Sequence, residues 1–167
     1  MSSLIPAISL QSLLEQKESD LLLLNDALHS HGFFSIVDHD IETDLLKESY
    51  EQAKIFFDLP EETKNKYARP ELGGARGYTP FGKETALGEK VADMKEFWHL
   101  GPEINESYDS RINKNLSVVE LEQFNIHFNQ LFNKLNKLGI CVLESIAIIL
   151  KQPVSYTHLR AHETDYY

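Results

Sequence analysis

The sequence has little cysteine and no long apolar run. Its 167 residues include a single cysteine, Cys141, which excludes a disulfide framework and any zinc finger built on cysteines. No stretch approaches the roughly 18 consecutive apolar residues that a membrane-spanning helix requires. The N-terminus lacks the basic start and the apolar centre of a signal peptide. We therefore expect a cytoplasmic protein with no membrane partner.

Positive charge is also scarce. The chain has 16 Lys and Arg against 26 Asp and Glu, which gives a formal net charge of −10. Its basic residues are scattered, whereas a nucleic-acid partner would need a basic patch to bind its phosphates. We therefore expect no nucleic-acid partner. The 42% hydrophobic composition is enough for a folded core and too high for a disordered chain.

The hydrophobic pattern predicts an α+β fold. Strand-like composition occurs in three segments, 5–10, 33–37 and 95–100. Helical spacing occurs in four segments, 12–29, 42–59, 61–66 and 117–151. Five of the eight glycines lie within 67–92, which indicates a loop with irregular strand.

Capping signals predict where the helices begin and end. Two S-x-x-E pairs match the capping box that starts a helix: Ser12 with Glu15, and Ser117 with Glu120. The first helix is expected to end at Gly32 as a C-cap glycine, and the last helix is expected to stop before Pro153.

Histidines are the first candidates for metal ligands. There are seven, His29, His31, His39, His99, His127, His158 and His162. None has an acid two residues later, although an iron site of the two-His-one-carboxylate type commonly needs an H-x-D/E pair. We expect solvent or capping roles for His29 and His31 and a boundary position for His127, and we leave His99 open.

Two other features could suggest chemistry but favour plain structural roles. Asp38-His39-Asp40 is interpreted as a turn, because immediate neighbours rarely point to one centre. Cys141 lies among apolar neighbours on a helix and is interpreted as a buried, inert thiol. The residues by themselves show no complete active site, so we predict no catalytic residue and no metal site.

Several segments together resemble one enzyme family. Residues 5–10 (IPAISL), 32–41 (GFFSIVDHDI), 56–64 (FFDLPEETK), 76–84 (RGYTPFGKE) and 93–96 (DMKE) are similar to motifs of the isopenicillin N synthase-like Fe(II)/2-oxoglutarate-dependent oxygenases. They occur in the family's order and spacing over residues 5 to about 101.

The resemblance implies a fold and an activity. Residues 1–116 would be the N-terminal region of a non-haem dioxygenase, and 117–153 a long helix that packs on a double-stranded β-helix (jelly-roll) domain. The parent enzyme would use Fe(II), O₂ and 2-oxoglutarate to hydroxylate, desaturate or cyclise a small-molecule substrate. The iron ligands and the 2-oxoglutarate-binding R-x-S lie in that jelly roll, which is largely missing here. We therefore expect this fragment to bind neither cofactor and to be inactive.

Substrate contacts are the role that the resemblance leaves to this part. It implies Arg76, Tyr78 and Glu84 as substrate-binding residues, because the family uses the R-G-Y loop near the pocket mouth. A guanidinium can bind a substrate carboxylate in a bidentate way. The alternative is that Arg76 only anchors its loop.

The sequence departs from the family pattern in two motifs. Ser9 replaces an aspartate, and the family's Asn-His-Gly is Asp38-His39-Asp40 here. Because Asp40 stands in place of a glycine, we expect some strain if that position is left-handed.

The last residues fit nothing before them. Residues 154–164 (VSYTHLRAHET) resemble the reading-frame translation of a transposase sequencing adapter. We interpret 154–167 as translated adapter rather than native sequence, and we assign no function to His158 or His162.

Two alternatives stay open for the function. One is a sister chemistry, such as an ethylene/succinate-forming or aminocyclopropane-carboxylate-oxidase-like reaction. The other is a non-catalytic helical interaction module whose partner surface is the apolar stripe of the 117–151 helix.

The fragment alone is predicted to self-associate or to be loosely packed. The stripe on the 117–151 helix carries seven large apolar residues, Leu121, Phe124, Phe128, Leu131, Leu135, Leu138 and Val142. Burying each contributes roughly 1.5–3 kcal/mol, so losing their cover could cost an amount comparable with the about 5–15 kcal/mol stability of a domain. Light scattering and thermal unfolding of residues 1–153 check this; a monomer with a sharp, cooperative transition would contradict it.

Overall fold

A computed structural model describes residues 5–84, 91–104 and 112–153 of the chain. The chain forms two compact units, 1–41 with 134–167 (unit 1) and 42–133 (unit 2). The predicted tail, 154–167, lies outside the described residues. None of the described helices is long and apolar enough to span a membrane.

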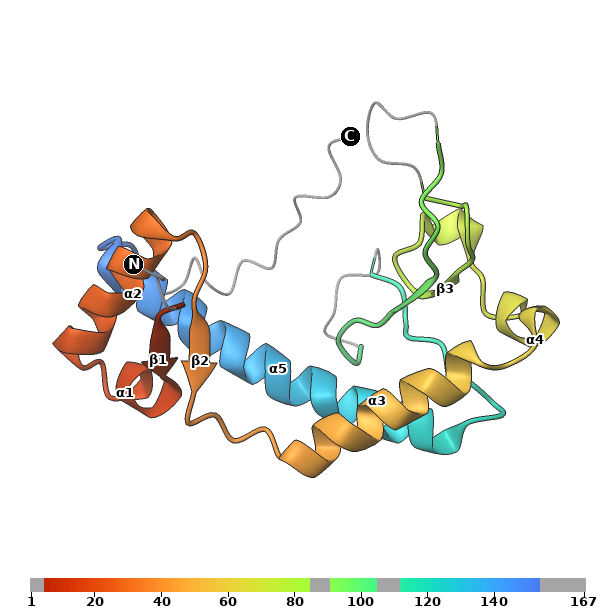
Figure 1. Cartoon of the computed structure of the whole chain (residues 1–167), viewed down its shortest axis with the longest axis horizontal. Helices are drawn as coiled ribbons and strands as arrows, with labels where there is room; N and C mark the ends of the chain where they lie inside the picture. The colour runs from red at the N-terminus through yellow and green to blue at the C-terminus, as the bar shows by residue number, and fades with distance from the viewer. Residues whose placement is uncertain (1–4, 85–90, 105–111, 154–167) are drawn as a thin grey trace. The chain divides into compact units, whose positions relative to one another are not determined.

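Unit 1 is built around a parallel pair of short strands (Figure 1). Strand β1 (Ala7–Ser9) pairs with β2 (Ser35–Val37), so that Ile8 lies opposite Ile36. Parallel strands need a crossover, which helices α1 (Leu10–Leu14) and α2 (Glu18–Ser30) supply. The core of this unit consists of Ile8, Leu10, Leu13, Leu24 and Cys141.

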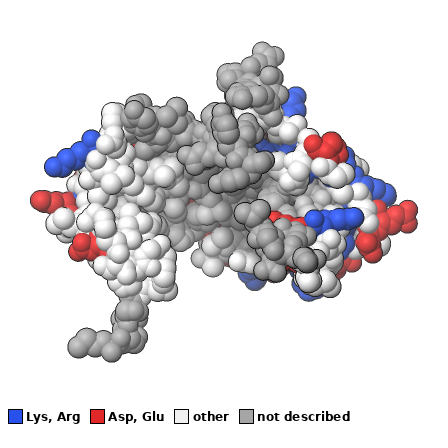
Figure 2. All heavy atoms as spheres, turned by 90° about the horizontal axis from the view of Figure 1, so that it is seen from above, with Lys and Arg blue, Asp and Glu red and all other residues white. Residues whose placement is uncertain are grey.

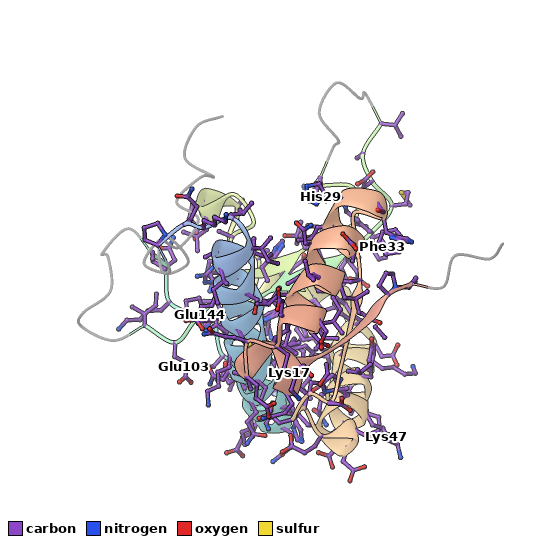
Figure 3. The ribbon with its side chains drawn as sticks, turned by 90° about the vertical axis from the view of Figure 1, so that its left-hand side faces the viewer. Lys17, His29, Phe33, Lys47, Glu103 and Glu144 are labelled. Atoms are coloured by element: carbon purple, nitrogen blue, oxygen red, sulfur yellow. The ribbon has the colours of Figure 1, made fainter. Side chains whose placement is uncertain are left out.

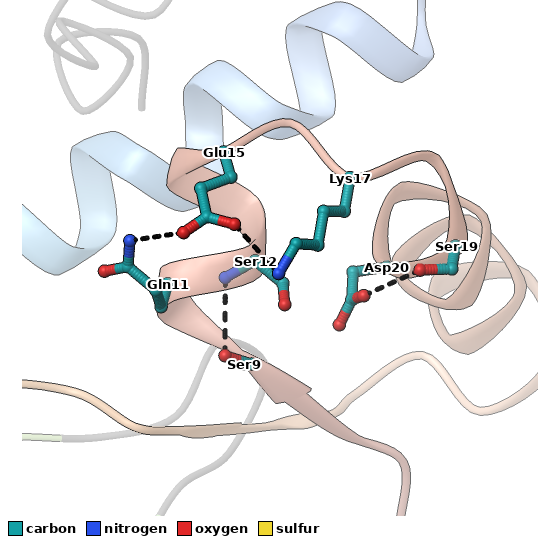
Figure 4. A network of polar contacts seen from close by, with 7 residues as sticks. All are labelled: Ser9, Gln11, Ser12, Glu15, Lys17, Ser19 and Asp20. Carbon is teal, nitrogen blue, oxygen red and sulfur yellow. Dashed lines mark hydrogen bonds and ion pairs between the residues drawn. The ribbon is translucent and has the colours of Figure 1, made fainter.

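The predicted single helix over 12–29 is interrupted, because residues 15–17 separate α1 from α2. The chain turns between α1 and α2, where Gln16 has a φ of 52°. Ser12 does not cap a helix, because its own backbone N–H donates to Oγ of Ser9 at 3.3 Å. Glu15 accepts from Gln11 and pairs with Lys17, each at 2.8 Å (Figure 4). The predicted end is confirmed, since Gly32 has a φ of 75° and its N–H donates to the carbonyl of Ala27.

The turn after β2 carries its left-handed residue at a different position from the one expected. Asp38 has a φ of 56°, whereas Asp40 is absent from the residues of positive φ among those described. The expectation of strain at Asp40 is therefore wrong. Lys134 Nζ donates to the backbone oxygen of Asp40 at 2.8 Å and holds the turn.

Unit 2 is an aromatic cluster surrounded by helices and a small sheet. Its elements are α3 (Thr43–Phe57), α4 (Glu61–Asn65), the short 3₁₀ turn η1 (Pro70–Leu72) and the antiparallel pair β3 (Gly77–Thr79) and β4 (Phe97–His99). Phe56 is fully buried at the centre, where its ring lies 5.0 Å from those of both Trp98 and Phe124.

Glycine is required where β3 approaches the chain before it. Gly77 has a φ of 81°, and a Cβ there would lie 2.5 Å from the backbone oxygen of Tyr67. Tyr78 N–H donates to that same oxygen at 3.1 Å. Because any side chain at residue 77 would push the two segments apart, this glycine sets the position of β3.

The last helix, α5 (Glu122–Ile149), contributes to both units and begins later than predicted. The Ser117–Glu120 capping box is wrong, because Glu120 instead accepts a hydrogen bond from the hydroxyl of Tyr67. The side chain of Asn125 instead holds the turn before the helix, since it accepts from the N–H of Val118 at 2.8 Å and donates to the carbonyl of Val118 at 2.9 Å. The predicted stop is confirmed, since the helix ends at Ile149, ahead of Pro153.

Candidate functional site

The two faces of the β3–β4 pair have different surroundings. In the register, Tyr78 lies opposite Trp98 and Thr79 opposite Phe97. Tyr78 and Trp98 belong to the aromatic core. Thr79 and Phe97 belong to the wall of a pocket of about 610 Å³, as the alternation of side chains along a strand requires.

This pocket, named here the hairpin pocket, lies entirely within unit 2. Its wall consists of Asn65, Ala68, Arg69, Pro70, Gly73, Gly74, Tyr78, Thr79, Pro80, Lys83, Glu84, Phe97 and His99. The wall is therefore apolar in part, with ionisable groups from the loops on either side of β3.

A buried polar cluster lies behind the hairpin. Lys64 is only 6% exposed, and its Nζ donates to Oε2 of Glu96 at 2.7 Å and to the carbonyl of Phe57 at 3.0 Å. The Tyr78 hydroxyl donates to the same Glu96 oxygen at 2.5 Å. Each charge is thus paired and hydrogen-bonded, which is the condition for keeping an ion pair out of water.

The environment of Tyr78 keeps its hydroxyl protonated. Burial raises the pKa of Tyr78 above its ordinary value, and the hydrogen bond to Glu96 raises the pKa further. A phenol in this state donates a hydrogen bond and does not act as a base near neutral pH. Tyr78 is therefore a hydrogen-bond donor within the fold, and it also belongs to the lining of the pocket.

Arg76 holds loops together. Its Nε donates to the carbonyl of Asn113 at 3.1 Å, and its Nη1 donates to the carbonyl of Ala75 at 2.6 Å. A Cβ added to Gly101 would overlap Nη2 of Arg76, so the guanidinium packs where only glycine leaves room. Arg76 is not among the residues that line the hairpin pocket.

Glu84 lines the hairpin pocket together with Tyr78. Its carboxylate lies 2.6 Å from Lys95 Nζ, which also pairs with Asp93 at 3.0 Å. The structure thus brings two of the three predicted substrate-binding residues to one pocket and places Arg76 elsewhere. A binding role for any of the three stays a prediction.

Sequence reasoning did not single out Lys64, Arg69, Lys83 or Glu96. Lys64 and Glu96 are 32 residues apart, and nothing local in the sequence indicates that they pair. Arg69 and Lys83 lie on either side of Tyr78 in the sequence. Their closeness in sequence to this predicted substrate-binding residue was the one available signal for a role at the same site. His99, left open from the sequence, is exposed and lines the pocket.

His29 and His127 have structural partners, whereas the half-buried His31 has no described hydrogen-bond partner for its Nδ1. His29 is exposed, and its Nδ1 lies 2.8 Å from the carbonyl of Asn25 near the end of α2 (Figure 3). His127 is half-buried, as predicted for a boundary residue, and its Nε2 lies 2.9 Å from Glu48. The described residues form no group of three or more His, Cys, Asp or Glu that could hold a metal ion. They therefore do not fit an iron site.

Cys141 is confirmed as a buried thiol, being 8% exposed. Burial raises the pKa of its thiol, which disfavours the nucleophilic thiolate.

Comparison with known proteins decides the family. A family model described as the N-terminal region of non-haem dioxygenases in morphine synthesis matches residues 5–120, more than half of the chain. The chain belongs to the Fe(II)/2-oxoglutarate-dependent oxygenase family. What it represents is the N-terminal region of such an oxygenase.

Curated and solved oxygenases are similar over most of this chain. A 2-oxoglutarate-dependent dioxygenase of Aspergillus niger, caaD, is 28% identical over 160 residues, which are 90% of this chain and 49% of that protein. The proline hydroxylase buaE of Petromyces alliaceus is 30% identical over 84% of this chain and 45% of its own length. A Caulobacter crescentus crystal structure assigned to the 2OG-Fe(II) oxygenase family superposes with a TM-score of 0.78 and 34% identity, over 94% of this chain and 52% of that one. The chain thus spans about half the length of these three oxygenases.

Removing the Tyr78 hydroxyl tests the buried cluster. In the full-length oxygenase, Tyr78→Phe is expected to lower the free energy of unfolding by about 1.5–3 kcal/mol at neutral pH, because a hydrogen bond to a charged group is lost. Tyr50→Phe, at a tyrosine that is 77% exposed, is the control and should have little effect.

The same variant has a predicted pH dependence. Because burial raises the pKa of Tyr78, the unfolded chain releases this proton above about pH 10 while the folded protein keeps it. Stability is therefore expected to fall as the pH rises past about 10, and Tyr78→Phe should reduce that fall. Burial also raises the pKa of Tyr67, so part of the fall should remain. Urea unfolding across this pH range measures both effects, and an unchanged profile in Tyr78→Phe would contradict the assignment.

Proposed function

We propose that this chain is the N-terminal part of an Fe(II)/2-oxoglutarate-dependent dioxygenase that oxidises a small molecule by hydroxylation, desaturation or ring closure. The observation that carries the proposal is the match of residues 5–120 to the dioxygenase N-terminal family. The superposition of 94% of the chain on the Caulobacter structure supports it. The parent enzyme would take O₂, Fe(II) and 2-oxoglutarate and would act in the cytoplasm.

The named relatives support a small-molecule substrate. One is a proline hydroxylase. A Neurospora crassa protein that was crystallised with α-ketoglutarate and thymine is 23% identical over 91% of this chain, with a TM-score of 0.70. At that identity the Neurospora structure supports the fold alone.

This part would supply one wall of the substrate site, and the other half of the parent enzyme would hold iron and 2-oxoglutarate. The hairpin pocket, with Tyr78 and Glu84 in its lining, is the part of unit 2 best suited to that role. Arg76 would bind the substrate from the loop in which its Nε donates to the carbonyl of Asn113.

Recovering the coding sequence across codon 153 tests the proposal. We expect a native reading frame with a downstream H-x-D, a distal His and R-x-S in place of residues 154–167. The purified full-length protein should then convert 2-oxoglutarate to succinate when Fe(II) and O₂ are supplied. Succinate can be followed by NMR. A native stop codon after residue 153 would contradict the proposal and favour the interaction module.

Replacing Arg76 tests its contribution to substrate binding. In the full-length enzyme, Arg76→Ala is expected to raise the substrate KM. If Arg76 only anchors the loops at Asn113 and Gly101, the thermal unfolding temperature should fall while KM stays unchanged. Steady-state kinetics and thermal unfolding of the same samples separate the two outcomes, with Lys47→Ala on the exposed side of α3 as the control (Figure 3).

A further inference from the structure

The hairpin pocket differs in charge from the chain around it. The whole chain carries a formal charge of −10, and acidic and basic side chains are interspersed on the face of unit 2 in Figure 2. Among the lining residues, Arg69 and Lys83 contribute two positive charges and Glu84 one negative charge, so these three side chains sum to +1. The one acid is already paired with Lys95 at 2.6 Å.

The two cations have capacity left for a ligand. Arg69 uses Nη1 to donate to the carbonyls of Lys66 and Ala68, at 2.9 and 2.8 Å. Its Nε forms a long ion pair with Glu71 at 4.0 Å, and no described residue accepts a hydrogen bond from its Nη2. Lys83 is exposed, and within the described part of the chain no acceptor or acid pairs with its Nζ.

The rest of the wall suits an apolar body. Ala68, Pro70, Pro80 and Phe97 present carbon surface, and the ring of His99 lies edge-on to Phe97 at 4.7 Å. A cavity with apolar walls and a few polar groups is typical of small-molecule sites. Paired with a local charge of +1, this wall is complementary to a monoanion with an apolar body.

We propose that the hairpin pocket binds the carboxylate of an apolar small-molecule substrate through Lys83 and Arg69. This deepens the proposed function and rests on the pocket being the substrate wall of the oxygenase. Lys83 attracts the carboxylate as a mobile ammonium, and Arg69 presents Nη2 from a guanidinium that its carbonyl contacts hold in place.

The test measures the binding of carboxylic acids to the full-length protein. 2-Oxoglutarate is present at a saturating concentration, so that its own site is filled and the acids do not bind there. The probes are phenylacetate, cinnamate and octanoate, each compared with its primary amide by ligand-observed NMR. We expect at least one acid to bind about tenfold more tightly than its amide, and added salt to reduce that preference. If no acid binds, or if acids and amides bind equally, the proposal is overturned.

Variants locate the binding. Lys83→Gln is expected to weaken binding of the acid about threefold to tenfold and to leave the amide unchanged, whereas Lys83→Arg should retain the preference for acid. Lys47→Gln, at another exposed lysine of unit 2, should change neither. If the Lys83→Gln variant binds the acid with the same affinity as the unaltered protein, the proposal is overturned.

Failure of the pocket and failure of the enzyme assignment give different results. If the protein forms succinate from 2-oxoglutarate but does not prefer acids to amides, the proposed function stands and the proposal for the hairpin pocket is overturned. If the protein prefers acids through Lys83 but forms no succinate under any condition, the proposed function is overturned instead.

Discussion

The buried ion pair between Lys64 and Glu96 is the constraint on which unit 2 depends. It joins α4 to the segment before β4, and the carbonyl of Phe57 at the end of α3 accepts a further bond from Lys64. Tyr78 brings β3 to the same Glu96 oxygen. Removing one partner of a buried pair leaves the other charge uncompensated, at a cost of about 3–5 kcal/mol. Four segments are therefore held in one arrangement by a single carboxylate and a single ammonium.

That arrangement determines which side chains reach the hairpin pocket. With Tyr78 hydrogen-bonded and Trp98 packed 5.0 Å from Phe56, the alternation of the strands directs Thr79 and Phe97 to the other face. A slip of one residue in the register would exchange the two faces. Such a slip would also break the bond from Tyr78 to Glu96, so the interior cluster selects the register that builds the pocket wall.

The sequence was informative where one local rule decides the structure. Apolar spacing predicted α3 and α5, and Gly32 and Pro153 marked helix ends, because each depends on neighbours within a few residues. It failed where a distant group competes with a local one. Neither S-x-x-E pair forms a capping box. Glu120 instead accepts from the hydroxyl of Tyr67, and Ser9 rather than Ser12 caps α1. The Lys64–Glu96 pair and the grouping of Arg69, Lys83 and His99 depend on the tertiary fold, and neither leaves a periodic signal.

The pocket wall also depends on contacts outside its lining. Strands β3 and β4 have three residues each, and a two-stranded ladder of that size is at best marginally stable by itself. Its position must therefore come from its attachments. On the core side the attachments are Tyr78 and Trp98. Beyond the strand ends, Arg76 donates to the carbonyl of Asn113. The side-chain amide of Asn115 bonds the N–H and the carbonyl of Gly101. A residue such as Arg76 can consequently stabilise the wall without touching the ligand. Affinity and stability must be measured together to tell a binding residue from a residue that positions the wall.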